Sequence, residues 1–423
     1  MVNAPKVGAQ YLPGIAIPGL ANLHCHAFQR GMAGLAERRG PAGDTFWTWR
    51  EVMYRFLGAL TPDDVEAIAA NAYMEMLEGG FTSVGEFHYL HHDIDGGRYA
   101  DLGEMAVRIA AAAAKTRINL TLLPSLYMTG GFGGKPAESG QRRFLNDTDR
   151  FAKLVDRSRN IVASLPDAIV GIAPHSLRAV PPDALKSVIQ SFPATPIHIH
   201  AAEQVKEVDE CIAALGARPV EWLLANAEVN SHWCLIHATH MTADETRSLA
   251  DSNVVAGLCP LTEASLGDGI FPAQAYLAAG GRLGVGTDSN IQIDAAAELR
   301  QLEYGQRLTH RARNMLALQE GESTGRRMFS EALAGGSQAV GRQGAGIEEG
   351  NPADIVLLDK DHPDLAAARD DQWLDAWVFV AGKSAVRTVL CGGKTVVERG
   401  RHILRSDISR RYRVVLERLL ASR

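Results

Sequence analysis

The sequence predicts an α/β protein: an eight-stranded parallel barrel with helices between its strands, followed by a small β domain. From about residue 20 to residue 290, short apolar runs alternate with longer helical patterns, which is the arrangement of successive βα units. Runs such as 169–173 (IVGIA) are apolar throughout, as expected of parallel strands buried on both faces. A length of 423 residues suits one large barrel and a small second domain.

Eight runs are expected to be the barrel strands, and their number indicates closure into a (β/α)8 barrel. They are residues 20–23, 82–86, 119–126, 168–173, 196–200, 233–237, 253–258 and 282–287. Residues 63–77 and 101–114 are expected to form two of the intervening helices, because alanine, leucine and acidic residues are good helix formers. Residues 294–318 are expected to form another long helix, and residues 35–49 and the glycine-rich stretch 130–134 are expected to be loops.

Strand patterns dominate the C-terminal part of the chain. Residues 346–359 lead into short strands at 385–390 and 394–398, with Cys391-Gly392-Gly393 as a hairpin turn. We therefore expect an extended N-terminal segment that joins a small β domain, then the barrel, the rest of the small β domain and a C-terminal helix. The expected boundaries are 1–18, 19–340, 341–405 and 406–423.

Composition excludes several classes of partner. Charged residues make up 22% of the chain without long runs of one sign, and the net charge is −6, so neither nucleic acid nor an anionic membrane surface is an expected partner. No stretch is long and apolar enough for a membrane span, and residues 1–20, with three prolines, do not resemble a signal peptide. Five cysteines without CxxC spacing argue against disulfides and thiolate zinc sites, so the cytoplasm is the expected location.

Polar residues gather where the predicted strands end, which is the face on which parallel barrels place their chemistry. The residues at such positions are His24, His26, Glu86, His88, His175, His200, His237 and Asp288. Because alternate residues of a strand face the same side, His24 and His26 can point inward together and bind one metal ion. An HxH pair is weak evidence in a chain with 14 histidines, but its position at a strand end strengthens the case.

The other candidates follow later strands. His200 ends the fifth strand and is followed by Ala-Ala-Glu203, His237 ends the sixth strand, and Asp288 follows the eighth. Each residue alone is at least as well explained as a hydrogen-bonded buried histidine or a helix-capping aspartate. His198 is best explained as a polar residue inside the barrel below the site. The coincidence of the others at strand ends favours a shared functional site.

Three neutral imidazoles and one carboxylate predict a catalytic zinc site. The HxH pair, His200 and Asp288 supply ligands that suit zinc and leave one position open for water. Zinc lowers the pKa of bound water to about 7. Asp288 is the expected acceptor of the water proton, His237 is expected to stabilise developing charge or assist that transfer, and Glu203 is expected to protonate a leaving nitrogen.

The pattern resembles the amidohydrolase superfamily, in which HxH follows strand one, histidines follow strands five and six, and aspartate follows strand eight of a distorted (β/α)8 TIM barrel. The residues that fill this pattern are His24, His26, His200, His237 and Asp288. The spacing from His200 to Glu203 is similar to the deaminase branch, which holds one metal ion and uses this glutamate to carry protons. Binuclear members have a carboxylated lysine at strand four, and residues 169–174 contain no lysine. The resemblance therefore implies one zinc ion, or another divalent metal in its place.

Longer motifs resemble the formimidoylglutamate deiminases within that superfamily. These motifs are 22–30 (NLHCHAFQR), 46–51 (FWTWRE), 85–89 (GEFHY), 175–178 (HSLR) and 259–269 (CPLTEASLGDG). They extend along nearly the whole barrel. The resemblance implies hydrolysis of N-formimidoyl-L-glutamate to N-formyl-L-glutamate and ammonia in histidine degradation.

A substrate with two carboxylates implies cationic partners. Arg50 and Arg178 are the best candidates, because a guanidinium can hold a carboxylate through two parallel hydrogen bonds. The resemblance also implies substrate contacts from Gln29, Tyr89 and His175. Without it, Arg50 would be one of many surface arginines, Tyr89 a core or rim aromatic residue, and Gln29 a polar loop residue.

The N-terminus departs from the pattern of this group. Its members carry several N-terminal β-strands that complete the small domain, whereas only about twenty residues precede the first barrel strand here. We therefore expect a truncated small β domain, either native or caused by a start assigned downstream. Its strands within 353–397 would need cover from another element or a second subunit. A homodimer is expected by analogy with other barrels of this kind.

Two other interpretations stay open. A deaminase of an aminated purine, pyrimidine or triazine shares the same pattern, but it would have a flatter, aromatic-lined pocket and little need for two arginines. A non-catalytic relative that uses the barrel as an interaction scaffold would be expected to have lost metal ligands, and here they are all present. The expected partner is therefore a small molecule with two carboxylates.

Overall fold

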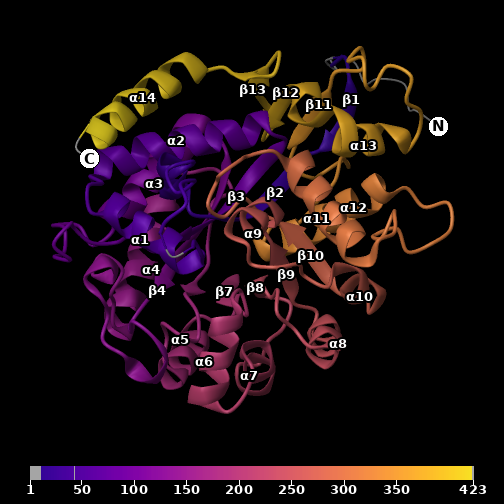
Figure 1. Cartoon of the computed structure of the whole chain (residues 1–423). Helices are drawn as coiled ribbons and strands as arrows, with labels where there is room; N and C mark the ends of the chain where they lie inside the picture. The colour runs from indigo at the N-terminus through magenta and orange to yellow at the C-terminus, as the bar shows by residue number, and fades with distance from the viewer. Residues whose placement is uncertain (1–10, 42, 422–423) are drawn as a thin grey trace.

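The computed structural model describes residues 11–41 and 43–421. Residues 1–10 of the expected N-terminal segment and residues 422–423 of the expected C-terminal helix lie outside the described residues. Strands occupy the centre of the molecule and helices surround them (Figure 1). A smaller sheet lies beyond one end of this central body, at the top of the view.

The central strands form two parallel sheets. They are β2 (Leu20–Cys25), β3 (Phe81–His88), β4 (Asn119–Leu126), β5 (Ile169–Val170), β6 (Ala173–Pro174), β7 (Ile197–Ala201), β8 (Trp233–His237), β9 (Val255–Leu258) and β10 (Arg282–Val285). One sheet has the order β2-β3-β4-β5, with β6 also paired to β4, and the other has the order β10-β9-β8-β7. Single parallel bridges join the two sheets on both sides: Cys25 to Asp288, Ile172 to Ile197, and Ser176 to His200. The architecture is of the TIM-barrel type.

Seven of the eight predicted strands correspond to single observed strands. Those at 119–126 and 233–237 coincide with β4 and β8, and the ends of five others differ by two residues or fewer. The prediction of one continuous strand at 168–173 is wrong, because the chain divides there into β5 and β6. A Cβ atom on Gly171 would lie 2.5 Å from the carbonyl oxygen of Pro196, so only glycine allows the backbones to approach this closely.

Helices and short helical turns connect the strands. The helices are α1 (Phe46–Leu57), α2 (Pro62–Glu78), α3 (Glu104–Thr116), α4 (Thr148–Val162), α5 (Pro182–Ser191), α6 (Val205–Leu215), α7 (Pro219–Asn226), α8 (Ala243–Asp251), α9 (Pro260–Leu266), α10 (Ala273–Ala278), α11 (Ala295–His310), α12 (Thr324–Ala339), α13 (Gln372–Ala376) and α14 (Arg405–Ala421). The turns are η1 (Ala27–Met32), η2 (Phe132–Gly134), η3 (Ser139–Gln141), η4 (Trp377–Ala381) and η5 (Gly382–Ala385). The helices predicted at 63–77 and 101–114 correspond to α2 and α3.

Two predicted boundaries are wrong for identifiable reasons. The helix expected at 294–318 ends at His310, because Arg311 adopts a left-handed conformation with φ 55°. The buried Glu303 carboxylate then accepts hydrogen bonds from the backbone of Met315 and Leu316, which folds the chain back onto α11. The loop expected at 35–49 already contains the start of α1, which begins at Phe46 after Thr45 as N-cap.

The smaller sheet is antiparallel and has five strands. They are β1 (Ile15–Pro18), β11 (Ile355–Leu358), β12 (Val386–Cys391), β13 (Lys394–Glu398) and β14 (Arg401–His402), in the order β1-β11-β12-β13-β14. Gly392 and Gly393 form the two-residue turn between β12 and β13, both with positive φ, as a type I′ hairpin requires. Cys391 therefore belongs to the strand and not to the turn. β1 pairs with β11 and covers that edge.

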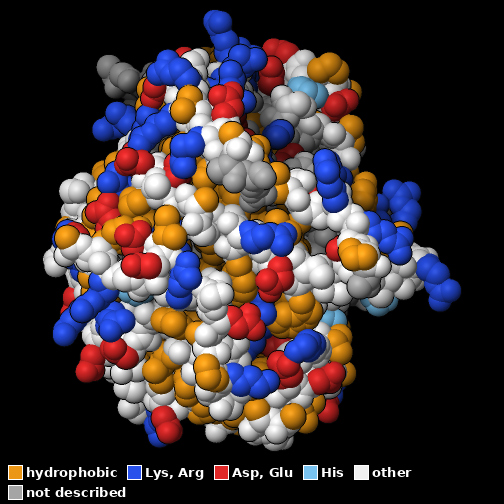
Figure 2. Space-filling model, turned by 60° about the vertical axis from the view of Figure 1, so that its left-hand side comes forward, with side chains coloured by type: hydrophobic (Ala, Val, Ile, Leu, Met, Phe, Trp, Pro, Cys, Tyr) orange, Lys and Arg blue, Asp and Glu red, His pale blue; other side chains and the backbone are white. Residues whose placement is uncertain are grey.

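The C-terminal helix lies on the outside of the molecule. α14 lies along α2 (Figure 1), and the Tyr412 hydroxyl donates a hydrogen bond to the backbone oxygen of Arg30, 3.1 Å away. On the face in Figure 2, side chains of both charge signs are interspersed. Among the described residues, no helix combines the length and the apolar character that crossing a membrane requires.

Candidate metal centre and active site

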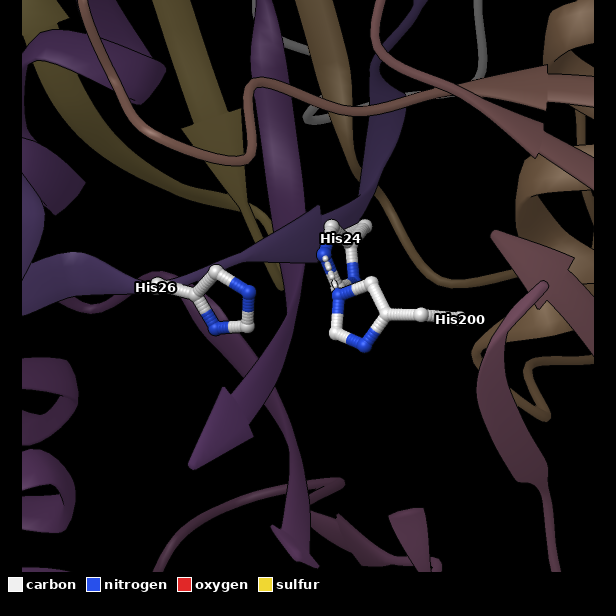
Figure 3. A group of neighbouring side chains, drawn as sticks. All are labelled: His24, His26 and His200. Carbon is white, nitrogen blue, oxygen red and sulfur yellow. Dashed lines mark hydrogen bonds between the residues drawn. The ribbon is translucent and has the colours of Figure 1, made fainter. Parts of the chain in front are cut away.

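Three buried histidines converge at the carboxyl ends of the central strands. His24 is in β2, His26 follows it, and His200 is in β7. One ring nitrogen from each lies within 4.8 Å of those of the other two, and the Nε2 atoms of His24 and His200 are 3.2 Å apart. Figure 3 shows the three rings around one point. The predicted HxH pair therefore meets a third imidazole from the other sheet.

Asp288 joins this group from the loop after β10. Its Oδ1 atom lies 3.5 Å from Nε2 of His24 and 3.3 Å from Nε2 of His26. The backbone N–H groups of Thr287 and Asp288 donate to the carbonyl oxygen of His24. A Cβ atom on Gly286 would lie 2.7 Å from both N and O of His24. Glycine is required here because any side chain would separate β10 from β2 and move Asp288 away from the histidines.

A buried hydrogen-bond network fixes the two segments to each other. Asn290 donates through Nδ2 to the backbone oxygens of His26 and Asp288, at 3.1 and 3.0 Å. Asn22 donates to the Thr287 hydroxyl, which donates in turn to Oδ1 of Asn290. The network thus spans from β2 to the loop after β10. It orients the HxH pair relative to Asp288.

The protonation of the three imidazoles fits metal binding. The Nδ1–H groups of His26 and His200 donate to the carbonyl oxygens of Phe87 and His175, at 2.8 and 2.9 Å. A carbonyl oxygen can only accept, so the Nε2 atoms that face the centre carry lone pairs. Burial lowers the pKa of His24, His26 and His200, which favours the neutral form that ligates metals. This donor set suits zinc.

His237 lies beside the metal-ligand group and among carboxylates. Its Nε2 atom is 3.7 Å from Oε1 of Glu203 and 3.9 Å from Oδ2 of Asp288, and its Nδ1 atom is 3.2 Å from Oε1 of Glu263. Burial works to lower the pKa of His237, but Glu203, then Glu263 and Asp288, outweigh it and raise the pKa to about 10. The surrounding carboxylates therefore favour the protonated form of His237.

Burial has the opposite effect on Glu203. It raises the pKa of this carboxyl group to about 7, which suits a group that both accepts and donates protons near neutral pH. The backbone N–H groups of Ala202 and Glu203 donate to the carboxylate of Glu207, at 3.2 and 3.0 Å. Glu207 therefore fixes the turn that presents Glu203.

The chain bends sharply where these residues leave the strands. His237 has φ 68° and Asp288 has φ 39°, a left-handed conformation that is uncommon for residues other than glycine, although less so for histidine and aspartate. Such conformations cost of order 1–3 kcal/mol each and gather at functional sites. Here they turn both side chains toward the metal-ligand group.

A cavity opens above this group. Its polar wall is formed by His26, Gln29, Arg50, His175, Arg178, His200, Glu203, His237 and Asp288. The remaining wall is formed by Phe46, Trp49, Met53, Tyr54, Tyr89, Tyr127, Phe144 and Leu266. Every residue predicted for catalysis or substrate binding therefore lines one cavity, and His24 contacts the group from within β2.

Arg50 and Arg178 enter the cavity without a counter-ion. Among the described residues, no carboxylate forms an ion pair with either guanidinium, and both Nε atoms are buried without an acceptor. Burial works to lower the pKa of Arg178, but Tyr127, Glu207 and Glu203 raise it overall. Two permanent positive charges thus face the same space.

The smaller predicted contacts are also in place. The Gln29 side chain donates through Nε2 to the Tyr89 hydroxyl at 2.8 Å, and its Oε1 atom has no partner within the described chain. Burial, followed by Arg178, lowers the pKa of His175, so this ring is neutral. His198 donates through Nε2 to the carbonyl oxygen of Ala339 at 2.8 Å and does not line the cavity. His198 occupies the internal structural position expected for it.

Two polar residues at strand ends stay outside the cavity wall. Glu86 accepts hydrogen bonds from the backbone N–H of Ala27 and the hydroxyl of Tyr73, both at 3.0 Å, and burial raises its pKa to about 7. Burial lowers the pKa of His88 to about 3. Position at a strand end was therefore not sufficient to place a residue in the cavity.

Sequence reasoning gave no role to Glu207, Glu263 or Tyr127. Glu263 lies inside the motif 259–269, and it could have been noticed as an acid three residues after Pro260 at the start of a helix. Its contact with His237 joins α9 to β8. No local sequence pattern predicts a contact between residues this far apart in the chain. Tyr127 directly follows β4. Its position at the end of a strand is the signal that could have placed it in the cavity wall.

The fold and this site define the class of protein. A family model described as the amidohydrolase family matches residues 15–396. The chain belongs to the amidohydrolase family.

Individual relatives narrow the comparison. The formimidoylglutamate deiminase of Pseudomonas aeruginosa is 48% identical to this chain over 419 residues, which are 99% of this chain and 92% of that protein. A crystal structure of an amidohydrolase from Brucella melitensis is 55% identical, with a TM-score of 0.93 over 96% of this chain and 90% of that one. A crystal structure of an adenosine deaminase from Xanthomonas campestris with bound zinc is 22% identical, with a TM-score of 0.78 over 96% of this chain and 86% of that one. The last similarity shows the fold alone.

Proposed function

We propose that this protein hydrolyses N-formimidoyl-L-glutamate to N-formyl-L-glutamate and ammonia, as the name of its relative from Pseudomonas aeruginosa suggests. The observation that carries the proposal is the pair of unpaired guanidiniums, Arg50 and Arg178, in the cavity that also holds the histidine group. Two cations without counter-ions in one cavity, the buried Arg178 and the half-buried Arg50, are costly unless a ligand brings the negative charges. A substrate with two carboxylates does so.

The metal would be held by His24, His26, His200 and Asp288. When bound there, a zinc ion supplies Lewis-acid chemistry and lowers the pKa of water. One ion is proposed because residues 169–174 offer no lysine for a second site. The neutral imidazoles and the clustering of their Nε2 atoms support this ligand set.

Three side chains would carry out the proton chemistry. Asp288 accepts a proton from the attacking water, because it is the carboxylate closest to the histidine group. His237 donates a hydrogen bond through Nε2 to the water oxygen and stabilises negative charge that develops on it. Glu203, with a pKa of about 7, gives a proton to the amidine nitrogen that leaves as ammonia.

The remaining wall would bind the substrate. Arg50 and Arg178 each hold a carboxylate through charge-assisted hydrogen bonds. Gln29 has a free acceptor in Oε1, which can receive the substrate's N–H. Tyr89 and His175 would pack against the chain of the substrate and limit its position.

One observation favours a second candidate. Six aromatic side chains line the cavity, and an aminated purine, pyrimidine or triazine would stack on such rings. That substrate would leave both arginines without a counter-ion, so we rank this candidate second. The catalytic residues would be the same.

A substrate panel separates the two candidates. Purified protein loaded with zinc would be assayed for ammonia release from N-formimidoyl-L-glutamate, its aspartate analogue, guanine and cytosine. The proposal expects the highest kcat/KM for formimidoylglutamate. Ammonia from guanine or cytosine and none from formimidoylglutamate would reverse the ranking.

Several finer features belong with this proposal. We propose that the two parallel sheets form one distorted, closed (β/α)8 barrel over 19–340, which the bridges at both sheet edges support. The small β domain would comprise 1–18 and 341–405, with 406–423 as a terminal helix. All five cysteines are buried and free, which supports a cytoplasmic location.

A further inference from the structure

Three cations surround one indole ring at the rim of the cavity. The guanidinium carbons of Arg50 and Arg178 lie 4.7 and 5.6 Å from the ring centroid of Trp47, and Nζ of Lys206 lies 4.9 Å from it. All three distances are within the range of cation–π attraction. The cations come from three separate elements: α1, the segment after β6, and α6.

Helix α1 places Trp47 and Arg50 on one face. The two residues are three positions apart, so they are neighbours on the helix surface, and Tyr54 continues the same face. The Arg50 guanidinium carbon lies 5.4 Å from the Tyr54 ring centroid. Phe46 packs edge-on against Trp47, with centroids 5.1 Å apart. The indole is therefore itself held in position.

Trp47 stands behind the arginines. The cavity wall includes Phe46, Trp49 and Arg50, but Trp47 is not part of the wall that the described residues form. Lys206 is paired with the Glu210 carboxylate, whereas Arg50 and Arg178 have no such partner in the described chain. The two arginines that lack a counter-ion thus share one aromatic surface.

We propose that Trp47 is a positioning residue for substrate specificity, which holds Arg50 and Arg178 side by side as a receptor for the two carboxylates of the substrate. This inference rests on the proposed function. Two like charges in one cavity repel each other, and their long side chains have many alternative rotamers. The negative face of the indole attracts both guanidiniums and restricts them before substrate arrives. Preorganisation of this kind improves affinity by reducing the ordering that binding requires.

The test compares a substrate that has two carboxylates with one that has a single carboxylate. Trp47→Leu and Trp47→Phe would be assayed with N-formimidoyl-L-glutamate and N-formimidoylglycine on the zinc-loaded enzyme. For the glutamate compound we expect KM to rise roughly 10-fold in Trp47→Leu and about 3-fold in Trp47→Phe, with kcat changed less than 2-fold. For the glycine compound we expect kcat/KM to fall less than it does for the glutamate compound. The ratio of the two kcat/KM values, which measures the selectivity for two carboxylates, therefore falls.

A matched control and a binding measurement complete the experiment. Trp373→Leu removes a half-buried tryptophan from α13, away from the cavity, and should leave both substrates unaffected. Glutarate is a dicarboxylate that cannot react. In calorimetric titrations with it, the dissociation constants of the wild type, Trp47→Phe and Trp47→Leu should increase in the same order as their KM values. In the Arg178→Met background, Trp47→Leu should have a smaller effect, because one of its two partners is gone.

The possible failures are distinguishable. Wild-type enzyme that does not release ammonia from formimidoylglutamate would contradict the proposed function. Wild-type turnover with an unchanged KM in Trp47→Leu would overturn the role of Trp47 alone. Equal losses for both substrates, or a fall in kcat with constant KM, would show that the indole only supports the fold of α1.

Discussion

The Nδ1 atom of His237 lies 3.2 Å from Oε1 of Glu263, and the same carboxylate oxygen accepts a hydrogen bond from the backbone N–H of Cys259 at 2.8 Å. A residue on α9 thus fixes the orientation of a ring at the end of β8. It also helps to keep that ring cationic.

Glu263→Gln should therefore lower kcat while leaving KM nearly unchanged. Glutamine can still accept from Cys259, but it lacks the negative charge that stabilises the His237 cation. We expect a loss of roughly 100-fold in kcat, the scale of a lost acid–base contribution. Steady-state ammonia release measures it, with the exposed Glu417→Gln on α14 as control. A kcat within 2-fold of the wild type would contradict this role.

Glu203→Gln and Asp288→Asn should both abolish turnover, but only one should weaken metal binding. Glu203 carries a proton and is not among the proposed ligands, whereas Asp288 is both ligand and proton acceptor. We expect activity to fall by more than about 100-fold in each variant. Elemental analysis after dialysis against a chelator should show retained zinc in Glu203→Gln and depleted zinc in Asp288→Asn. Circular dichroism would verify that both fold. Near-normal ammonia release from either variant would contradict the proton-transfer role assigned to that residue.

Arg178→Met should raise KM for formimidoylglutamate. The change strands one substrate carboxylate, and a hydrogen bond to a charged group contributes about 1.5–3 kcal/mol. We expect KM to rise roughly 10- to 100-fold. Arg410→Met on the exposed face of α14 is the matched control. An unchanged KM would count against substrate binding by Arg178.

His198 should make the protein less stable in acid. Burial lowers its pKa to about 4 in the folded state, against about 6.5 in an unfolded chain. The unfolded state therefore binds more protons between these values, so stability is full above about pH 6.5 and declines as the pH falls toward 4. From pH 6.5 to 5 the contribution of this residue is about 2 kcal/mol.

Urea unfolding of His198→Gln at several pH values measures this effect. The variant can keep a donor toward Ala339 but cannot titrate, so its free energy of unfolding should decrease less between pH 6.5 and 5 than that of the wild type. His310→Gln, an exposed change at the end of α11, should behave as the wild type does. Parallel pH profiles for His198→Gln and the wild type would disprove the assignment.

Much of the fold could be predicted because local patterns dominate it. β8 is apolar except for its terminal histidine, β4 is rich in leucine, and the predicted ends of both strands agree with the structure. The division of the fourth strand at Gly171 depends on the approach of Pro196, which directly precedes β7. The end of α11 depends on Glu303, whose carboxylate binds the chain twelve and thirteen residues later. Contacts of this kind have no local signature.

The candidate site could also be predicted only in part. His24, His26, His200, His237 and Asp288 could be predicted to meet because the carboxyl ends of parallel strands converge. Gln29, Arg50, Tyr89, His175 and Arg178 came from motif resemblance, and the structure brings them into the same cavity. The roles of all these residues stay predictions. Glu263 and Trp47 act through other side chains, so only the assembled fold reveals them.

Product analysis tests the central claim most directly. Zinc-loaded protein would be incubated with N-formimidoyl-L-glutamate, and the products would be identified by NMR alongside an ammonia assay. The account predicts N-formyl-L-glutamate and ammonia in equal amounts, because Glu203 protonates the terminal nitrogen while the arginines hold the glutamate portion. Formamide and L-glutamate as products, or no consumption of this substrate by the metal-loaded protein, would contradict it.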